Sequence, residues 1–107
     1  MEATEDLRTR LRALRDEIDV TDRELLRLLN QRALLSLEVG QVKAQMSETG
    51  NPDNIFNPRR ERQVLDNLAS WNTGALPQRH IENIWREIFS SSRALQGMDR
   101  PAEDVRA

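Results

Sequence analysis

Apolar residues recur at alternating spacings of four and three along the first part of this chain. The recurring positions are Leu7, Leu11, Leu14, Ile18, Leu25, Leu28, Leu35, Val39, Val42 and Met46. This spacing is typical of an amphipathic helix with one buried stripe. No proline interrupts the stretch, so the pattern predicts a single helix from about residue 4 to about residue 45.

The length of this helix limits how its stripe can be buried. At 1.5 Å per residue the helix would be roughly 60 Å long. A compact domain of this size has a radius of gyration of only about 13 Å. The rest of the chain cannot cover such a stripe, and the simplest cover is the same helix of a second copy. We therefore predict a homodimer.

The remainder of the chain predicts two shorter helices. Residues 47–54 are rich in Gly, Pro and Asn, which indicates a loop. Asn57 and Pro58 suit the N-cap and first position of a helix that ends near Gly74. Pro77 opens a third helix, which Gly97 closes. The predicted class is all-α with three helices per chain, residues 1–97 forming one domain and 98–107 a polar C-terminal tail.

The composition excludes several kinds of partner. The chain has 16 basic and 18 acidic residues and a net charge of −2, so it offers no basic surface for nucleic acid or membranes. It has no cysteine, and its polar, acidic N-terminus is unlike a secretory signal peptide. No apolar run reaches membrane-spanning length. We predict a cytoplasmic protein.

Two cations lie on or beside the apolar stripe. Arg32 interrupts the stripe, and no carboxylate shares its face nearby. Burying an unpaired charge is costly, so an anionic ligand is a candidate partner. Lys43 follows eleven residues later, roughly 16 Å along the same face. These two cations could bracket a small dianion, whereas taken singly they would be read as a snorkelling or ion-paired arginine and a surface lysine.

Polar groups border the apolar faces of all three predicted helices. Arg15 lies beside the stripe but on a different face from Arg32, so an antiparallel second copy would have to deliver it. The shorter helices add Arg60, Glu61, Ser92 and Gln96. Each residue taken singly would be a solvated helix position. Together they suit a small molecule with two carboxylates and a hydroxyl.

The sequence lacks the motifs of several other chemistries. It has no metal-ligand spacing, no glycine-rich phosphate loop and no pair of nucleophile and base. Any catalysis would therefore rest on positioning and electrostatics.

These residues resemble the all-helical (AroQ-type) chorismate mutases over residues 7–96. The resemblance rests on five fragments in order, which are Leu14-Arg15-x-x-Ile18-Asp19, Leu28-Leu29-x-x-Arg32, Val39-Gly40-x-x-Lys43, Arg60-Glu61 and Ser92-x-x-x-Gln96. It implies an intertwined homodimer that rearranges chorismate to prephenate in aromatic amino acid biosynthesis. The reaction is a Claisen rearrangement without cofactor, metal or covalent intermediate. Such domains can be fused to enzymes that act on prephenate.

The resemblance also implies a role for each residue. Arg32 and the second copy's Arg15 would bind the substrate carboxylates. Lys43 and Gln96 would donate to the ether oxygen, and Glu61 would accept from the ring hydroxyl. Arg60 and Ser92 would complete the pocket.

Two features depart from the family pattern. Asn57 stands where the family often has Asp, so we expect a cap or a backbone contact there. The loop from 45 to 57 is longer than in the tightest members and could close on the substrate as a lid.

Two rival functions remain open on the sequence. An isochorismate-pyruvate lyase shares this scaffold, although Arg60, Glu61 and Ser92 favour the mutase. A non-enzymatic helical dimerisation or regulatory module would not need Arg32 and Lys43 in an apolar stripe.

Overall fold

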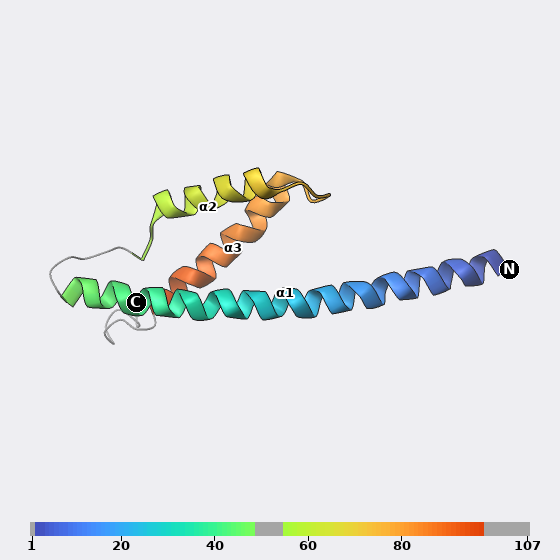
Figure 1. Ribbon diagram of the computed structural model, residues 1–107, viewed down its shortest axis with the longest axis horizontal. Coiled ribbons are helices and arrows are strands. Elements are labelled where there is room, and N and C mark those ends of the chain that lie inside the picture. The colour runs from blue at the N-terminus through green and yellow to red at the C-terminus, as the bar shows by residue number, and fades with distance from the viewer. Residues whose placement is uncertain (1, 49–54, 98–107) are drawn as a thin grey trace. The chain divides into compact units, whose positions relative to one another are not determined.

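The computed structural model describes residues 2–48 and 55–97 and consists of three helices (Figure 1). They are α1 (Glu2–Glu48), α2 (Pro58–Trp71) and α3 (Gln78–Gly97). The predicted all-α class with three helices is confirmed. The first helix extends beyond the expected 4–45 at both ends. The loop segment 49–54 and the predicted tail 98–107 lie outside the described residues.

Side-chain capping sets where α2 begins and ends. The Asn57 side chain accepts a hydrogen bond from the Arg60 backbone N–H at 3.0 Å, as its predicted N-cap role requires. The helix ends at Trp71, before the expected Gly74. The reason is Asn72, whose backbone N–H donates to Leu68 and whose side chain bonds the backbone of Gly74 and Leu76. These bonds fold the chain into a turn before Gly74 is reached.

The buried apolar core of the described residues belongs to α3, which contacts α2 and diverges from it beyond the turn that joins them (Figure 1). Backbone N–H groups of His80 and Ile81 donate to the Pro77 carbonyl, so α3 begins directly after that proline, as predicted. Ile81 and Phe89 are buried, eight residues apart on one face of α3. The last turns of α3 reach the part of α1 that follows Ala33, through the hydrogen bonds of Ser92 and Gln96.

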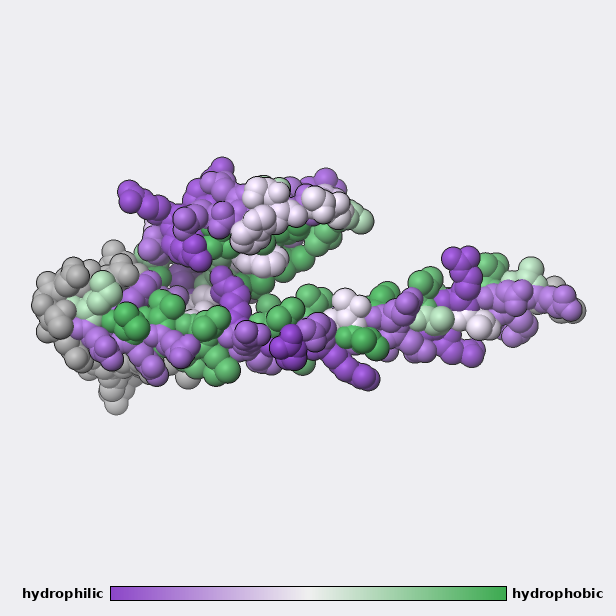
Figure 2. Space-filling view, in the orientation of Figure 1, coloured by the Kyte–Doolittle hydropathy of each residue, from purple (hydrophilic) through white to green (hydrophobic). Residues whose placement is uncertain are grey.

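The chain divides into two units, Met1–Arg32 and a second that begins at Ala33. In the first unit the apolar stripe is exposed. Each residue of this stripe is between 45% and 65% exposed, at Leu7, Leu11, Leu14, Ile18, Leu25 and Leu28. In the second unit Leu35, Val39 and Val42 are exposed as well. Figure 2 shows apolar side chains at the surface along α1. No described helix is both long and apolar enough to cross a membrane.

Candidate functional site

Lys43 and Gln96 form the centre of the candidate site, where α1 meets α3. The Lys43 side chain is buried, with 8% of the residue exposed, and its Nζ donates to Gln96 Oε1 at 3.0 Å. An ammonium can only donate, so the Gln96 amide must present its oxygen to Lys43. The Gln96 amide NH₂ is thereby turned away from Lys43. The arrangement holds two hydrogen-bond donors next to each other.

A second contact joins the same two helices nearby. Ser36 Oγ donates to Ser92 Oγ at 3.1 Å, and Ser36 is buried. Gly40 lies between Ser36 and Lys43 on the same face of α1, and it is also buried. On α3, Ser92 and Gln96 are four residues apart and share a face. The structure therefore brings together three of the predicted site residues: Lys43, Ser92 and Gln96.

Glu61, at the start of α2, is linked to this part of α3 by an ion pair with Arg93. The side chains are 23% exposed at Glu61 and 34% exposed at Arg93. The Arg93 guanidinium also lies over the Phe56 ring, 5.3 Å from its centroid. Glu61 is thus held towards α3 by the residue that follows Ser92.

The structure does not bring Arg60 to these residues. The Arg60 guanidinium donates to Gln63 on its own helix at 2.7 Å, and the residue is exposed. Asn57 contributes its side chain to the helix cap. Arg15 and Arg32 belong to the first unit, where Arg15 is exposed and Arg32 is half-buried.

The sequence reasoning missed Ser36 and Arg93. The contact at Ser36 was predictable, because the two small residues Ser36 and Gly40, four positions apart, indicate a helix face that another helix can approach closely. The contact at Arg93 was not, since its partner Glu61 is 32 positions away. The sequence also sets Lys43 apart, because it is the only lysine among the 16 Lys and Arg residues. A compact ammonium differs from the planar guanidinium fork, so this choice is specific.

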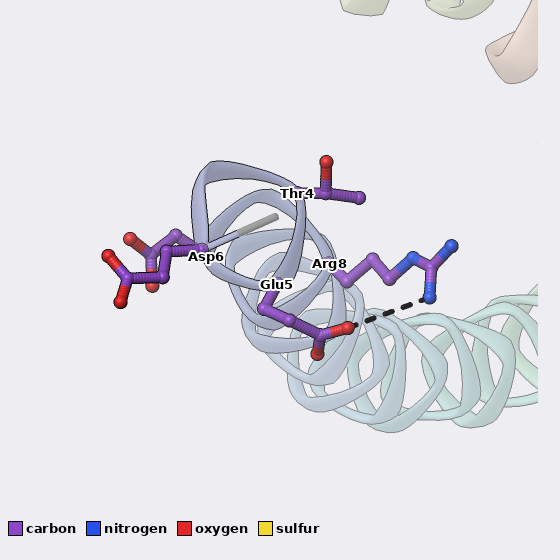
Figure 3. A pocket seen from close by; sticks show the side chains of 5 residues that line it. Thr4, Glu5, Asp6 and Arg8 are labelled. Carbon is purple, nitrogen blue, oxygen red and sulfur yellow. Dashed lines mark ion pairs between the residues drawn. The ribbon is translucent and has the colours of Figure 1, made fainter.

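A surface hollow at the start of α1 does not resemble a site for an anion. It is lined by Glu2, Thr4, Glu5, Asp6 and Arg8. Figure 3 shows these side chains around the first turns of α1, with an ion pair between Glu5 and Arg8. All five residues are exposed and three are acidic, so the hollow would repel a dianion.

One exposed ion pair on α1 shifts pKa values without forming a site. A hydrogen bond from Arg27 lowers the pKa of the Glu24 carboxyl, and the same bond raises the pKa of Arg27. Both groups face solvent three residues apart, as an ordinary helix surface pair does. Among residues 2–48 and 55–97, no cluster of His, Cys, Asp and Glu could hold a metal ion.

Comparison with known proteins identifies relatives of this chain. Residues 14–97 match the family model described as chorismate mutase type II. The chain is 37% identical over 86 residues to a bifunctional chorismate mutase/prephenate dehydratase of Pseudomonas aeruginosa. It is 39% identical over 90 residues to the protein of the same name from Aquifex aeolicus. Each alignment covers 80% of this chain but 24% of the relative, so the chain spans about a quarter of their length.

A solved structure covers nearly the same extent as this chain. Chorismate mutase (form II) from Thermus thermophilus is 37% identical, with a TM-score of 0.73. The match covers 84% of this chain and 97% of that one. The resemblance inferred from the five sequence fragments is therefore confirmed.

The ion pair between Glu61 and Arg93 predicts a difference between two arginines. Arg93→Met should lower the free energy of unfolding by about 1 kcal/mol, because it removes a partly buried pair and the contact with Phe56. Arg62→Met is the control. It removes an exposed pair with Asp66 and should cost less than about 0.5 kcal/mol. Urea unfolding followed by circular dichroism, at one protein concentration, measures both. Equal losses would show that Arg93 does not tie α2 to α3.

Proposed function

Because the chain belongs to the chorismate mutase type II family, we propose that it rearranges chorismate to prephenate. The observation that carries this proposal is the pairing of the buried Lys43 with the half-buried Gln96, two adjacent donors held where two helices meet. The proposed reaction breaks the ether C–O bond and forms a C–C bond in one step. It needs no nucleophile and no proton transfer.

The donor pair suits the charge that develops in this reaction. Negative charge grows on the enolpyruvyl side, including the ether oxygen, as the C–O bond lengthens. Lys43 and the Gln96 amide NH₂ would both donate to that oxygen. An ammonium has three N–H donors, so Lys43 can hold the Gln96 oxygen and a substrate oxygen together. Donors fixed before the reaction stabilise the transition state without reorganisation.

The other site residues would bind and orient the substrate. We assign Glu61 to the ring hydroxyl, since a carboxylate can accept from that hydroxyl and from Arg93 at once. Ser92 lies beside the donor pair on α3 and would complete the pocket. Arg60 would have to leave Gln63 to reach the substrate. For Asn57 we propose a role in shaping the start of α2.

The arginines proposed to bind the substrate carboxylates would come from two copies of the chain. Arg32 would bind one carboxylate, and Arg15 of the second copy would help to bind both. The exposed apolar stripe of α1 supports a homodimer, because covering one leucine side chain contributes roughly 2 kcal/mol. The proposed partners are thus chorismate and a second copy, and the proposed domain is residues 1–97.

The loss of chorismate absorbance with purified protein tests the activity. We expect turnover by the wild type and a fall in kcat of about 100-fold to 1,000-fold in Lys43→Met, which removes one transition-state donor. Isochorismate is the second substrate to assay. Salicylate from isochorismate without loss of chorismate would indicate the lyase instead. If neither substrate reacts and Arg32→Ala stabilises the dimer, the regulatory module is the better interpretation.

The Gln96 amide predicts how activity depends on pH. An amide does not titrate, so this group should cause no loss of wild-type activity between mildly acidic and mildly basic pH. In Gln96→Glu the introduced carboxyl donates only when protonated. Because an ordinary glutamic acid titrates near 4.3, kcat relative to wild type should rise about 10-fold or more from pH 8 to pH 5. A kcat ratio that falls as the pH falls would contradict the donor role.

Mixing two inactive variants tests whether Arg15 crosses between copies. Arg15→Ala and Lys43→Met should each have little activity. After joint unfolding and refolding, a mixed dimer has one intact site, with Arg15 from one chain and Lys43 from the other. An equal mixture should therefore recover about a quarter of wild-type activity. If the mixture shows only the mean of the two variants, each site takes Arg15 and Lys43 from the same chain.

A further inference from the structure

Gly40 lies at the crossing of α1 and α3, where the backbone of Gln96 leaves no room for a side chain. A Cβ on Gly40 would be 2.6 Å from the Gln96 carbonyl oxygen, 2.7 Å from its Cα and 3.1 Å from its carbonyl carbon. These are backbone atoms, which cannot rotate away as the end of a side chain can. A methyl group at position 40 would therefore force the two helices apart.

Local helix stability does not explain this glycine. Gly40 is inside α1, and its φ is not in the left-handed region. In a helix interior, glycine is less stable than alanine by roughly 0.5–1 kcal/mol. The glycine thus weakens α1 locally, and the close approach of α3 is what requires it.

The hydrogen bonds on either side of Gly40 depend on this close approach. Ser36 and Ser92 are joined at 3.1 Å before Gly40, and Lys43 and Gln96 at 3.0 Å after it. A Cβ at 2.6 Å would have to move out to 3.4 Å to reach ordinary contact. A shift of that size would stretch both bonds beyond the usual limit of about 3.2 Å.

We propose that Gly40 is a positioning residue for catalysis: its missing side chain sets the separation of α1 and α3 that holds Gln96 against Lys43. The proposal rests on the mutase activity proposed above. Gly40 acts through the two donors and does not touch the substrate. Misplacing catalytic groups by about 1 Å can cost roughly 100-fold in rate.

Gly97 provides a matched control. It follows Gln96 directly, at the end of α3, and a Cβ there would meet Ile55 Cδ1 at 3.8 Å, an ordinary contact. Gly97→Ala therefore adds the same methyl group next to the same catalytic residue without forcing the helices apart.

The kinetic experiment compares Gly40→Ala and Gly97→Ala, each in the wild type and in Gln96→Leu. In the wild type, Gly40→Ala should lower kcat by about 100-fold with a smaller change in KM, and Gly97→Ala should change kcat by less than about threefold. In Gln96→Leu, adding Gly40→Ala should cost less than about threefold more, because the donor that it displaces is already gone. Unchanged kcat in Gly40→Ala would overturn the proposal. A loss in kcat of about 100-fold in both the wild-type and the Gln96→Leu background would also overturn the proposal, because a general packing defect would lower kcat whether or not Gln96 is present.

The reactivity of Lys43 measures the geometry without chorismate. Lys43 is the only lysine, so mass spectrometry after treatment with an amine acylating reagent reports its ε-amine separately from the N-terminus. Opening the crossing exposes the buried Lys43, and Gly40→Ala should react several-fold faster than wild type or Gly97→Ala. Equal reaction rates would contradict the proposal. If wild type fails to turn over chorismate, this measurement still decides whether Gly40 sets the separation of α1 and α3, so failure of the spacing role and failure of the proposed activity are distinguishable.

A second pair of variants applies if Gly40→Ala does not fold by circular dichroism. Ser36→Leu places a larger side chain against Ser92 and should push α1 and α3 apart. Ser36→Ala removes the hydrogen bond to Ser92 without adding bulk. The proposal expects faster Lys43 acylation and a lower kcat in Ser36→Leu than in Ser36→Ala. Equal values in these two variants would overturn it.

Discussion

The hydrogen bond between Lys43 and Gln96 is the interaction on which the site depends. It joins the buried Lys43 of α1 to the half-buried Gln96 of α3, and it sets which hydrogen-bonding group each partner presents. The ammonium can only donate, so it selects the orientation of the Gln96 amide in which the oxygen faces Lys43 and the NH₂ group faces away from it. A lysine suits this task better than an arginine, because a compact ammonium can contact an amide and a ligand oxygen from a narrow space. The same hydrogen bond therefore joins the two helices and fixes the orientation of two hydrogen-bond donors, the Lys43 ammonium and the Gln96 NH₂ group.

The sequence predicted those helices whose extent or ends are set by residues close together in the chain. The spacing of leucines predicted α1, and the pair Asn57-Pro58 predicted the start of α2 through a side-chain cap that the structure contains. The end of α2 was misplaced at Gly74, because the turn is made by Asn72, which bonds backbone groups on both sides of it. Glycine is a frequent helix stop but not an obligatory one. An asparagine that satisfies several backbone groups can end a helix earlier.

The site was only partly predictable because its contacts join distant positions. Lys43, Ser92 and Gln96 were predicted, and the structure brings them together. The pairing of Glu61 with Arg93 was not, since nothing in the spacing of residues sets which arginine of α3 faces α2. Arg60 precedes Glu61 directly and was an equal candidate on the sequence, yet its guanidinium bonds Gln63 on its own helix. One residue along a helix turns the side chain by about 100°, and that rotation separates the two roles.

The positions of Lys43 and Arg15 along α1 connect the proposed dimer to the proposed reaction. Lys43 belongs to the unit that begins at Ala33, and this unit holds its donor pair within a single chain. Arg15 belongs to the other unit, among leucines that remain exposed in the single chain. Covering those leucines would stabilise the dimer even with an empty site, because apolar burial needs no ligand. The role proposed for Arg15 begins only when a dianion arrives. Apolar contacts would thus assemble the two copies first, and substrate binding would then use a cation that assembly has already placed.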